Sequence, residues 1–511
     1  MAKEKGAEES KVSRRDFVKG TVTGLVVGAI ATGAGAAAMW PPAAPPAGVV
    51  TQTVTQAAQT VTVSAPGKPA PFEGKSITVV LHSGHFEVPW RDWYSGPIKE
   101  IFGVDLKVVG IPIGELFEKE LLELSTGTGA YDLLMFSPAW MGDYVKYLLP
   151  LDDYMLKDDP AWGDIHGGFR EWENTYGGKV YSLTMDGDVI LLYYRKDLFE
   201  DPKEKADFKA KYGYNLALPQ TWDQYNDVAE FFKRDRNGDG QTDLWGCAEQ
   251  GKRGRQFYWY MLRYIAYSSP DPHLFDPTNM KPLINSPNAL AALESYKRSI
   301  DLSPPGVLGF EWDELFSAFM NGSVAMMCHW PDEGKRYNEL KDPLAKTPQM
   351  GFGVPPGVIK DGVLYKRSMT FGGWLLGIAK ASKNPDAAYA VLRYFESPEV
   401  SLRLVTDPAT GQDFFRYSHF YSPKVKAMGI PKEYLDAFEE NIRLLYPELR
   451  IPGGAQYNDI LDLQTSRFLA GEISAKEALD TVAKEWERIT DEHGRDSQLK
   501  LYREAMGLPS L

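Results

Sequence analysis

The stretch from Lys179 to Phe199 constrains the fold more than any other part of this sequence. Two apolar runs, residues 179–185 and 189–194, flank the break Asp186-Gly187-Asp188. Continuous apolar runs of this length are typical of strands that are buried on both faces. The break fits a strand that crosses between two lobes. It fits equally well a β-turn between two strands of one sheet, since Asp-Gly pairs favour turns.

The length and composition predict a globular protein with two lobes. At 511 residues the chain exceeds what a single hydrophobic core usually organises, and 43% hydrophobic with 24% charged residues is ordinary for a globular protein. The formal net charge of −13 argues against nucleic acid as a partner, because phosphate binding needs clustered Lys and Arg. Aromatic residues make up 13% of the chain, enough to supply rings for ligand stacking as well as for the core.

The first 75 residues have the composition of an export signal followed by a tether. Arg14 and Arg15 precede an apolar stretch from Val22 to Trp40, which is typical of a twin-arginine export signal and is also close to the length of a retained membrane anchor. Residues 41–75 are rich in Pro, Ala, Thr, Gln and Val, as expected for an extended tether. We therefore expect residues 1–40 to direct export, and residues 41–75 to hold the protein at the outer face of the membrane unless it is secreted.

Strands and helices alternate in the folded part of the chain. Apolar runs at Ser76–Leu81, Val104–Val109 and Tyr131–Phe136 predict strands, and Gly114–Leu124 predicts a helix between the second and third. This order indicates an α/β lobe with a largely parallel sheet, in which ligands bind beyond the carboxyl ends of the strands. The rule points to residues 82–86 and 137–140 as part of a binding site.

A second local pattern predicts a structural calcium ion. Oxygen-bearing side chains recur at the spacing of a calcium loop, at Asp235, Asn237, Asp239, Gln241 and Asp243. Gln241 would contribute its backbone carbonyl, and the glutamate of an EF-hand is missing at the twelfth position. The alternative is a polar turn that binds no ion.

Signatures of catalysis are scarce in this sequence. No nucleophile elbow, zinc-protease, P-loop or dinucleotide motif is present. Cys247 and Cys328 are the two cysteines, so no Cys-based metal framework exists, and whether they form a disulfide stays open. Paired carboxylates such as Asp186 and Asp188 could serve a glycosidase, and Glu115 is a further candidate.

Several segments in order resemble the family-1 extracellular solute-binding proteins of ABC importers, the group that includes the maltodextrin-binding proteins. The segments that carry the resemblance are Tyr131-Asp132-Leu133-Leu134 with Trp140, Gly177-Gly178-Lys179, Tyr194-Arg195-Lys196-Asp197-Leu198, Pro219-Gln220-Thr221-Trp222, residues 319–326, Gly372-Gly373-Trp374, and Ser382-Lys383-Asn384-Pro385. The twin-arginine signal and the tether resemble archaeal members in particular.

The resemblance implies a type II periplasmic-binding-protein-like fold, with two α/β lobes joined by three hinge crossings. The crossings would lie near Met185–Val189, Gly372–Ile378 and Met428–Lys432. The N-terminal lobe would then comprise residues 76–186 and 378–430, and the C-terminal lobe residues 187–377 and 431–511. The first crossing favours the hinge interpretation of Asp186-Gly187-Asp188.

The resemblance also implies a binding protein rather than an enzyme. The expected ligand is a sugar or oligosaccharide, delivered by a monomeric receptor to the permease subunits of an ABC importer when the two lobes close. The alternatives are a secreted carbohydrate-active enzyme and a receptor for a solute such as glycerol-phosphate, which Lys252, Arg253 and Arg255 could bind. The residues expected to contact ligand are His82, His85, Glu115, Trp140, Asp186, Asp188, Arg255, Trp330, Asp332, Gly373, Trp374 and Tyr457.

Overall fold

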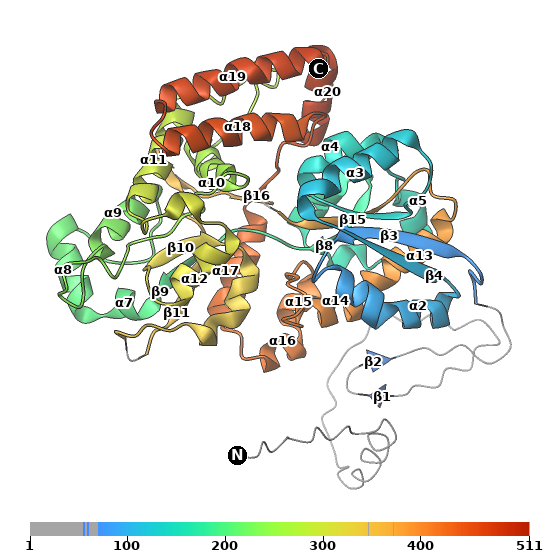
Figure 1. Ribbon diagram of the computed structural model, residues 1–511, viewed down its shortest axis with the longest axis horizontal. Helices are drawn as coiled ribbons and strands as arrows, with labels where there is room; N and C mark the ends of the chain where they lie inside the picture. The colour runs from blue at the N-terminus through green and yellow to red at the C-terminus, as the bar shows by residue number, and fades with distance from the viewer. Residues whose placement is uncertain (1–54, 57–58, 61–69, 346, 371, 510–511) are drawn as a thin grey trace, which may run out of the picture. The chain divides into compact units, whose positions relative to one another are not determined.

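Two separate β-sheets organise the part of the chain that the computed structural model describes, which is residues 55–56, 59–60, 70–345, 347–370 and 372–509 (Figure 1). The first sheet has five strands in the order β4-β3-β5-β15-β8. The bounds of these strands are β3 Ser76–His82, β4 Asp105–Ile111, β5 Leu133–Phe136, β8 Ser182–Asp186 and β15 Trp374–Ile378. The second sheet is antiparallel, in the order β10-β9-β11, with β9 Leu191–Arg195, β10 Met326–His329 and β11 Met350–Gly353.

The first sheet is parallel through β4, β3 and β5, and β15 runs antiparallel to both of its neighbours. Alternate residues of β5 enter two different cores: Leu133 and Met135 join one, while Leu134 and Phe136 join the other. Because all four side chains are fully buried, the sheet is covered on both faces. The continuous apolar run in the sequence predicted this burial.

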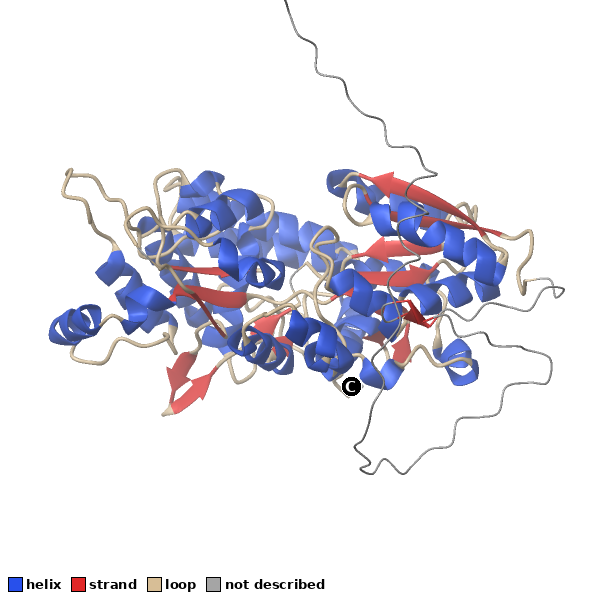
Figure 2. Cartoon of the chain, turned by 90° about the horizontal axis from the view of Figure 1, so that it is seen from below, coloured by secondary structure: helices blue, strands red, loops and turns tan. Residues whose placement is uncertain are grey.

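Helices enclose the strands of both sheets (Figure 2). The segments that connect strands of the first sheet, together with the residues after β15, contain these helices: η1 Pro89–Tyr94, α2 Ser95–Phe102, α3 Ile113–Thr126, η2 Pro138–Trp140, α4 Met141–Tyr144, η3 Val145–Tyr147, α5 Asp152–Lys157, η4 Trp162–Asp164, α6 Gly167–Phe169, η5 Arg170–Asn174, α13 Pro385–Phe395, α14 Pro398–Val405, α15 Tyr417–Tyr421 and α16 Pro423–Ala427.

The remaining helices follow β9 or come after α16. They are α7 Lys196–Glu200, α8 Pro202–Tyr212, α9 Trp222–Phe232, α10 Gln256–Ser268, α11 Pro287–Asp301, η6 Val307–Gly309, α12 Trp312–Met320, η7 Pro331–Glu339, α17 Lys432–Arg443, α18 Gly454–Leu469, α19 Ala475–Glu492 and α20 Arg495–Ala505. Thr221 and Ser474 are the N-caps of α9 and α19, since each side chain accepts a hydrogen bond from the backbone N–H three residues on.

Three connections carry the chain between the two sheets. The first is residues 187–190: β8 belongs to the first sheet and β9 to the second, so the hinge interpretation is confirmed and the hairpin is wrong. The second lies between β14 (Ser368–Met369) and β15. The third lies between α16 and α17, where α17 packs against β11. The two-lobed α/β arrangement with three crossings is therefore as expected.

The second crossing needs a correction. We predicted it at Gly372–Ile378 and began the returning N-terminal lobe at residue 378, but Trp374–Ile378 already pairs with both β5 and β8. The crossing therefore ends before Trp374, and β15 belongs wholly to the first sheet. The sequence pattern hid this because β15 is apolar at every position, so nothing in it marks where the sheet begins.

Four short two-stranded sheets complete the described fold. They are β1 Thr55–Gln56 with β2 Gln59–Thr60, β6 Thr175–Tyr176 with β7 Lys179–Val180, β12 Val358–Lys360 with β13 Val363–Tyr365, and β14 with β16 Leu445–Tyr446. The predicted signal and most of the predicted tether lie outside the described residues. Within the described ranges, no helix combines the length and the apolar character needed to cross a bilayer. Cys247 and Cys328 are both buried and free, so no disulfide joins them.

Candidate functional site

Aromatic rings gather in the first sheet where β3 ends and β15 begins. The imidazole of His82 stacks on the indole of Trp374, with ring centroids 6.1 Å apart and an interplanar angle of 23°. Trp140 meets Trp374 edge-on at 6.0 Å, and Phe86 does so at 5.9 Å. His85 lies 6.2 Å from His82, centroid to centroid. The structure thus brings together four of the predicted residues from three separate segments of the first lobe.

Residues from the second lobe reach the same place. Arg255, the N-cap residue of α10, holds its guanidinium carbon 5.7 Å from the ring centroid of Trp330. Burial, the neighbouring His85 and then the charge of Arg255 lower the pKa of His82, so Arg255 and His82 act on one another across the two lobes. A histidine ring that is neutral at physiological pH can donate a hydrogen bond to a ligand hydroxyl or accept one from it.

Gly372 joins the aromatic group to the carboxylates of the hinge. Its φ of +82° is a backbone conformation that side chains disfavour. A Cβ there would lie 3.2 Å from Nε1 of Trp330 and 3.5 Å from Oδ2 of Asp188. Glycine at this position therefore lets the backbone of the second crossing pass between an indole of one lobe and a carboxyl group of the first crossing.

The carboxyl groups of the first crossing are buried beside a lysine. Oxygen atoms of Asp186, Asp188 and Asp413 all lie within 4.8 Å of one another. The backbone N–H of Asp413 donates to Oδ1 of Asp186 at 2.6 Å, and Nζ of Lys335 lies 3.1 Å from Oδ1 of Asp413. Burial, followed by the neighbouring carboxylates, raises the pKa of Asp188 well above its usual range. The raised pKa favours the protonated form of Asp188, which can donate a hydrogen bond through its O–H and adds no further buried charge.

Asp332 belongs to the same acidic neighbourhood. Burial and the charge of Asp413 raise the pKa of Asp332 to about 7, although Lys335 opposes the shift. Gly373, another of the predicted site residues, lies in a tight space, since a Cβ would lie 3.1 Å from the carbonyl oxygen of Asp186 and 3.3 Å from Oε1 of Glu173.

Two predicted residues do not join this group. Glu115 lies on the exposed side of α3, with its side chain 57% exposed and paired with Nζ of Lys119 at 2.6 Å. Tyr457 is fully buried between α18 and α19, where its hydroxyl is hydrogen bonded to Oγ1 of Thr490 at 2.9 Å. Its ring meets those of Phe275 and Trp486, so helix packing accounts for its position.

Three residues that the sequence did not single out belong to the site: Asp413, Lys335 and Glu173. Glu173 is fully buried, and neither carboxylate oxygen has a hydrogen-bond partner. Lys335 is three residues past Asp332, a spacing that could have suggested it. Asp413 and Glu173 carry no local signal, because they reach the hinge only through the packing of distant segments.

The predicted calcium loop forms a chain of side-chain-to-backbone turns. Asp235 accepts hydrogen bonds from the backbone N–H groups of Asn237, Gly238 and Gly240. Oδ1 of Asp243 accepts from Arg236, while Oδ2 is buried without a partner. Oδ1 of Asn237 accepts from the backbone N–H of Asp239, and Oδ1 of Asp239 accepts from that of Gln241. The side chains of the pattern carry oxygen, the kind of donor that calcium requires.

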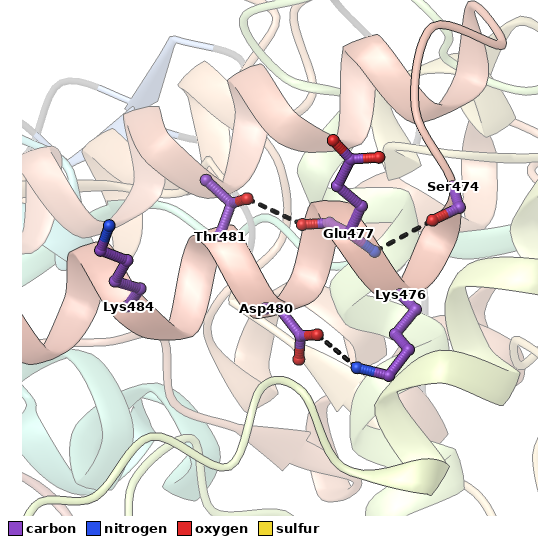
Figure 3. Close-up of a pocket in the computed structure, with 6 residues that line it drawn as sticks. All are labelled: Ser474, Lys476, Glu477, Asp480, Thr481 and Lys484. Carbon is purple, nitrogen blue, oxygen red and sulfur yellow. Dashed lines mark hydrogen bonds and ion pairs between the residues drawn. The ribbon is translucent and has the colours of Figure 1, made fainter.

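A hollow on the surface lies apart from these residues. It has a volume of about 420 Å³ and is lined by Ser474, Lys476, Glu477, Asp480, Thr481 and Lys484 (Figure 3). All six residues come from α19 and its N-cap, and Lys476 pairs with Asp480 within the helix. A hollow made by one helix offers no converging polar groups of the kind that fix a ligand.

The fold and the gathered residues agree with one family. A model of the bacterial extracellular solute-binding proteins matches residues 89–401, more than half of the chain, and the protein belongs to this family. A Deinococcus radiodurans relative named as a probable ABC transporter-binding protein is 27% identical over 308 residues, which is 59% of this chain and 67% of the relative.

Solved structures show the same two-lobed type II fold. An Agrobacterium radiobacter K84 solute-binding protein in complex with ribitol is 22% identical, with a TM-score of 0.65 over 82% of this chain and 100% of that one. The maltose-bound MalE3 protein of T. maritima is also 22% identical, with a TM-score of 0.62 over 81% of this chain and 99% of that one. At this identity the similarity establishes the fold, and the ligand has to be argued from the site.

Proposed function

We propose that the protein is the extracellular receptor of an ABC importer for a sugar or a polyol. The observation that carries the proposal is the convergence of rings from both lobes, His82 and Trp374 from one and Trp330 from the other, on buried carboxyl groups of the first crossing. The names of the relatives agree with it, because one is a probable ABC transporter-binding protein and two bind ribitol and maltose.

Sugars and polyols need this combination of groups. Their C–H faces pack on indole rings, and their hydroxyls take charge-assisted hydrogen bonds from arginine and give them to carboxylates. Asp186 and Asp188 would accept or donate such bonds, and Arg255 would donate them. Once the lobes close, a missing hydroxyl leaves a buried partner unpaired, which is how such a site rejects close analogues.

A phosphorylated solute is a weaker candidate because two of the three cations that could bind it are already paired. Nζ of Lys252 lies 2.6 Å from Oε2 of Glu311, and Nη2 of Arg253 lies 3.1 Å from Oδ1 of Asp459. Of these three cations only Arg255 is then left for a phosphate, and the buried carboxyl groups of the hinge would disfavour a dianion nearby.

The proposed ligand class is tested by a thermal-shift panel on the full-length protein, with pentitols, hexitols, mono- and disaccharides, malto-oligosaccharides, glycerol-phosphate and amino acids. We expect one polyol or sugar to raise the melting temperature, since a ligand at 100 times its Kd contributes about 2.7 kcal/mol to the stability of the folded state. A response to glycerol-phosphate or to an amino acid alone would contradict the assignment.

We also propose that residues 235–243 bind a structural calcium ion through Asp235, Asn237, Asp239, Asp243 and the carbonyl of Gln241. Calcium is expected to raise the melting temperature relative to chelator, and Asp235→Ala is expected to abolish the difference, because Asp235 supplies the first ligand. Asp276→Ala is the matched control, since Asp276 makes a similar turn with Thr278 outside the loop. Equal melting temperatures in calcium and chelator would show that the loop is only a polar turn.

The same proposal extends to the amino terminus. A twin-arginine segment and a Pro/Thr-rich tether would place the receptor outside the membrane, where the family acts. Replacing Arg14 and Arg15 by lysine is expected to leave the protein inside the cell, and cell fractionation would measure this. Unchanged export of the variant would contradict the twin-arginine assignment.

A further inference from the structure

A histidine and two carboxyl groups meet where β10 ends and η7 begins. His329 is the last residue of β10, and Asp332 and Glu333 follow in the first turn of η7. One ligand atom from each of the three side chains lies within 4.8 Å of the other two. His329 is fully buried and Glu333 is 1% exposed, while Asp332 is partly buried.

The hydrogen bond on the far side of His329 fixes how its ring is protonated. Nε2 lies 3.2 Å from the backbone carbonyl of Trp312, and because a carbonyl can only accept, Nε2 carries the hydrogen. The ring is fully buried, which disfavours its charged form. Nδ1 is then a bare lone pair, and it is buried without a hydrogen-bond partner. A carbonyl that holds the other ring nitrogen is the usual support of a metal-binding histidine.

The two carboxyl groups add acceptors that are also unpartnered. Both oxygens of Glu333 and Oδ1 of Asp332 are buried without a hydrogen bond. The nearest recorded cation to Glu333 is Arg336, whose Nη1 lies 3.9 Å from Oε2 while its Nη2 lies 2.7 Å from Oε2 of Glu339. Four buried acceptor atoms without a hydrogen-bonded donor form an arrangement that a bound cation would stabilise.

The cluster of carboxyl groups at the hinge is a weaker candidate for a metal site. Asp186, Asp188 and Asp413 also converge within 4.8 Å, but the ammonium of Lys335 already lies 3.1 Å from Asp413. A backbone N–H fills another acceptor position on Asp186. That group therefore has its own cation and donor at hydrogen-bond distance, whereas Nδ1 of His329, Oδ1 of Asp332 and both oxygens of Glu333 have no hydrogen-bond partner.

We propose that His329, Asp332 and Glu333 bind a divalent transition-metal ion of the zinc class. One neutral imidazole and two carboxylates form a ligand set suited to zinc, and their two negative charges balance the ion inside the buried site. Ligand atoms on a tetrahedral zinc lie about 3.5 Å apart, so small rotations of Asp332 and Glu333 would complete the geometry. The fourth position would be open to water or to an oxygen of the bound solute.

The test uses full-length protein without a polyhistidine tag, stripped with chelator and loaded with Zn²⁺ or Co²⁺. We expect one equivalent of zinc per chain by elemental analysis, and a visible Co²⁺ spectrum that marks nitrogen ligation. Glu333→Gln and His329→Gln are expected to weaken zinc binding by more than about 100-fold, beyond the roughly 10–100-fold that losing an outer partner costs.

Two matched variants make the result specific. Glu120→Gln changes another fully buried glutamate with an unpartnered oxygen, away from this group, and should keep the full equivalent of zinc. Asp235→Ala should also keep it, which separates this ion from the proposed calcium. Absence of a Co²⁺ spectrum in the unmodified protein, or zinc retained in Glu333→Gln, would overturn the proposal. Neither outcome depends on which solute the receptor binds.

Discussion

Replacing Trp374 by alanine is expected to weaken binding of the cognate sugar or polyol by about 30-fold or more. Interface anchors of this kind cost about 2 kcal/mol or more when truncated, and each 1.4 kcal/mol is tenfold in affinity. Trp374 touches His82, Phe86 and Trp140 and adjoins the second crossing, so its indole is the ring most shared within the site. Calorimetric titration of the variant with the solute that stabilises the unmodified protein gives the loss directly.

A conservative replacement separates ligand contact from packing. Trp374 is 8% exposed, so Trp374→Ala also loses stability, and its melting temperature must be measured beside its affinity. Trp374→Phe keeps a flat face and should retain most of the affinity. Trp486→Phe alters an indole buried between α18 and α19 and should leave the affinity unchanged. Full affinity in Trp374→Ala would show that the indole of Trp374 does not contact the ligand.

Replacing Arg263 by methionine is expected to lower the free energy of unfolding by about 3–5 kcal/mol, the usual cost of breaking a buried ion pair. Arg263 and Glu249 are both fully buried, with Nη2 of the arginine 2.8 Å from Oε1 of the glutamate. The guanidinium carbon also lies 3.9 Å from the ring centroid of Trp222. Without the arginine, Glu249 would be left charged and unpaired in the core. Urea denaturation measures the difference.

The double variant tests whether the unpaired charge causes the loss. Arg263→Met combined with Glu249→Met removes both charges and should recover much of the stability, because well-packed apolar replacements of buried pairs are often neutral. Arg488→Met is the exposed control: its partners Glu485 and Glu492 lie on the surface of α19, so it should leave the stability almost unchanged. A cost as small as this for Arg263→Met would contradict the assignment.

The sequence predicted the strands well because their signals are local, whereas the hinge crossings were expected from the family resemblance. The run Ser76–Leu81 became β3 at Ser76–His82, and the acidic break at residues 186–188 became the first crossing. A strand buried on both faces leaves a continuous apolar run, which needs no tertiary information to recognise. The start of β15 was misplaced for the opposite reason, since an unbroken apolar run carries no mark of where pairing begins.

For the candidate site, the sequence predicted some of the residues and missed others. The rule on strand ends pointed to Trp140, whereas Trp330 and Trp374 were expected in the site from the family resemblance. Glu115 and Asp413 show what the sequence lacks: one acid is exposed on α3 and the other is 1% exposed at the hinge, although both look like ordinary surface acids in the sequence. Burial of a single charge depends on segments far away in the chain, and no local pattern records it.

Calorimetric titration of the unmodified full-length protein with the responding solute, followed by chemical recovery of that solute, tests the receptor assignment most directly. The prediction is one sugar or polyol bound per chain and recovered unchanged. A solute converted to product, or the absence of binding by every sugar and polyol in the panel, would contradict it.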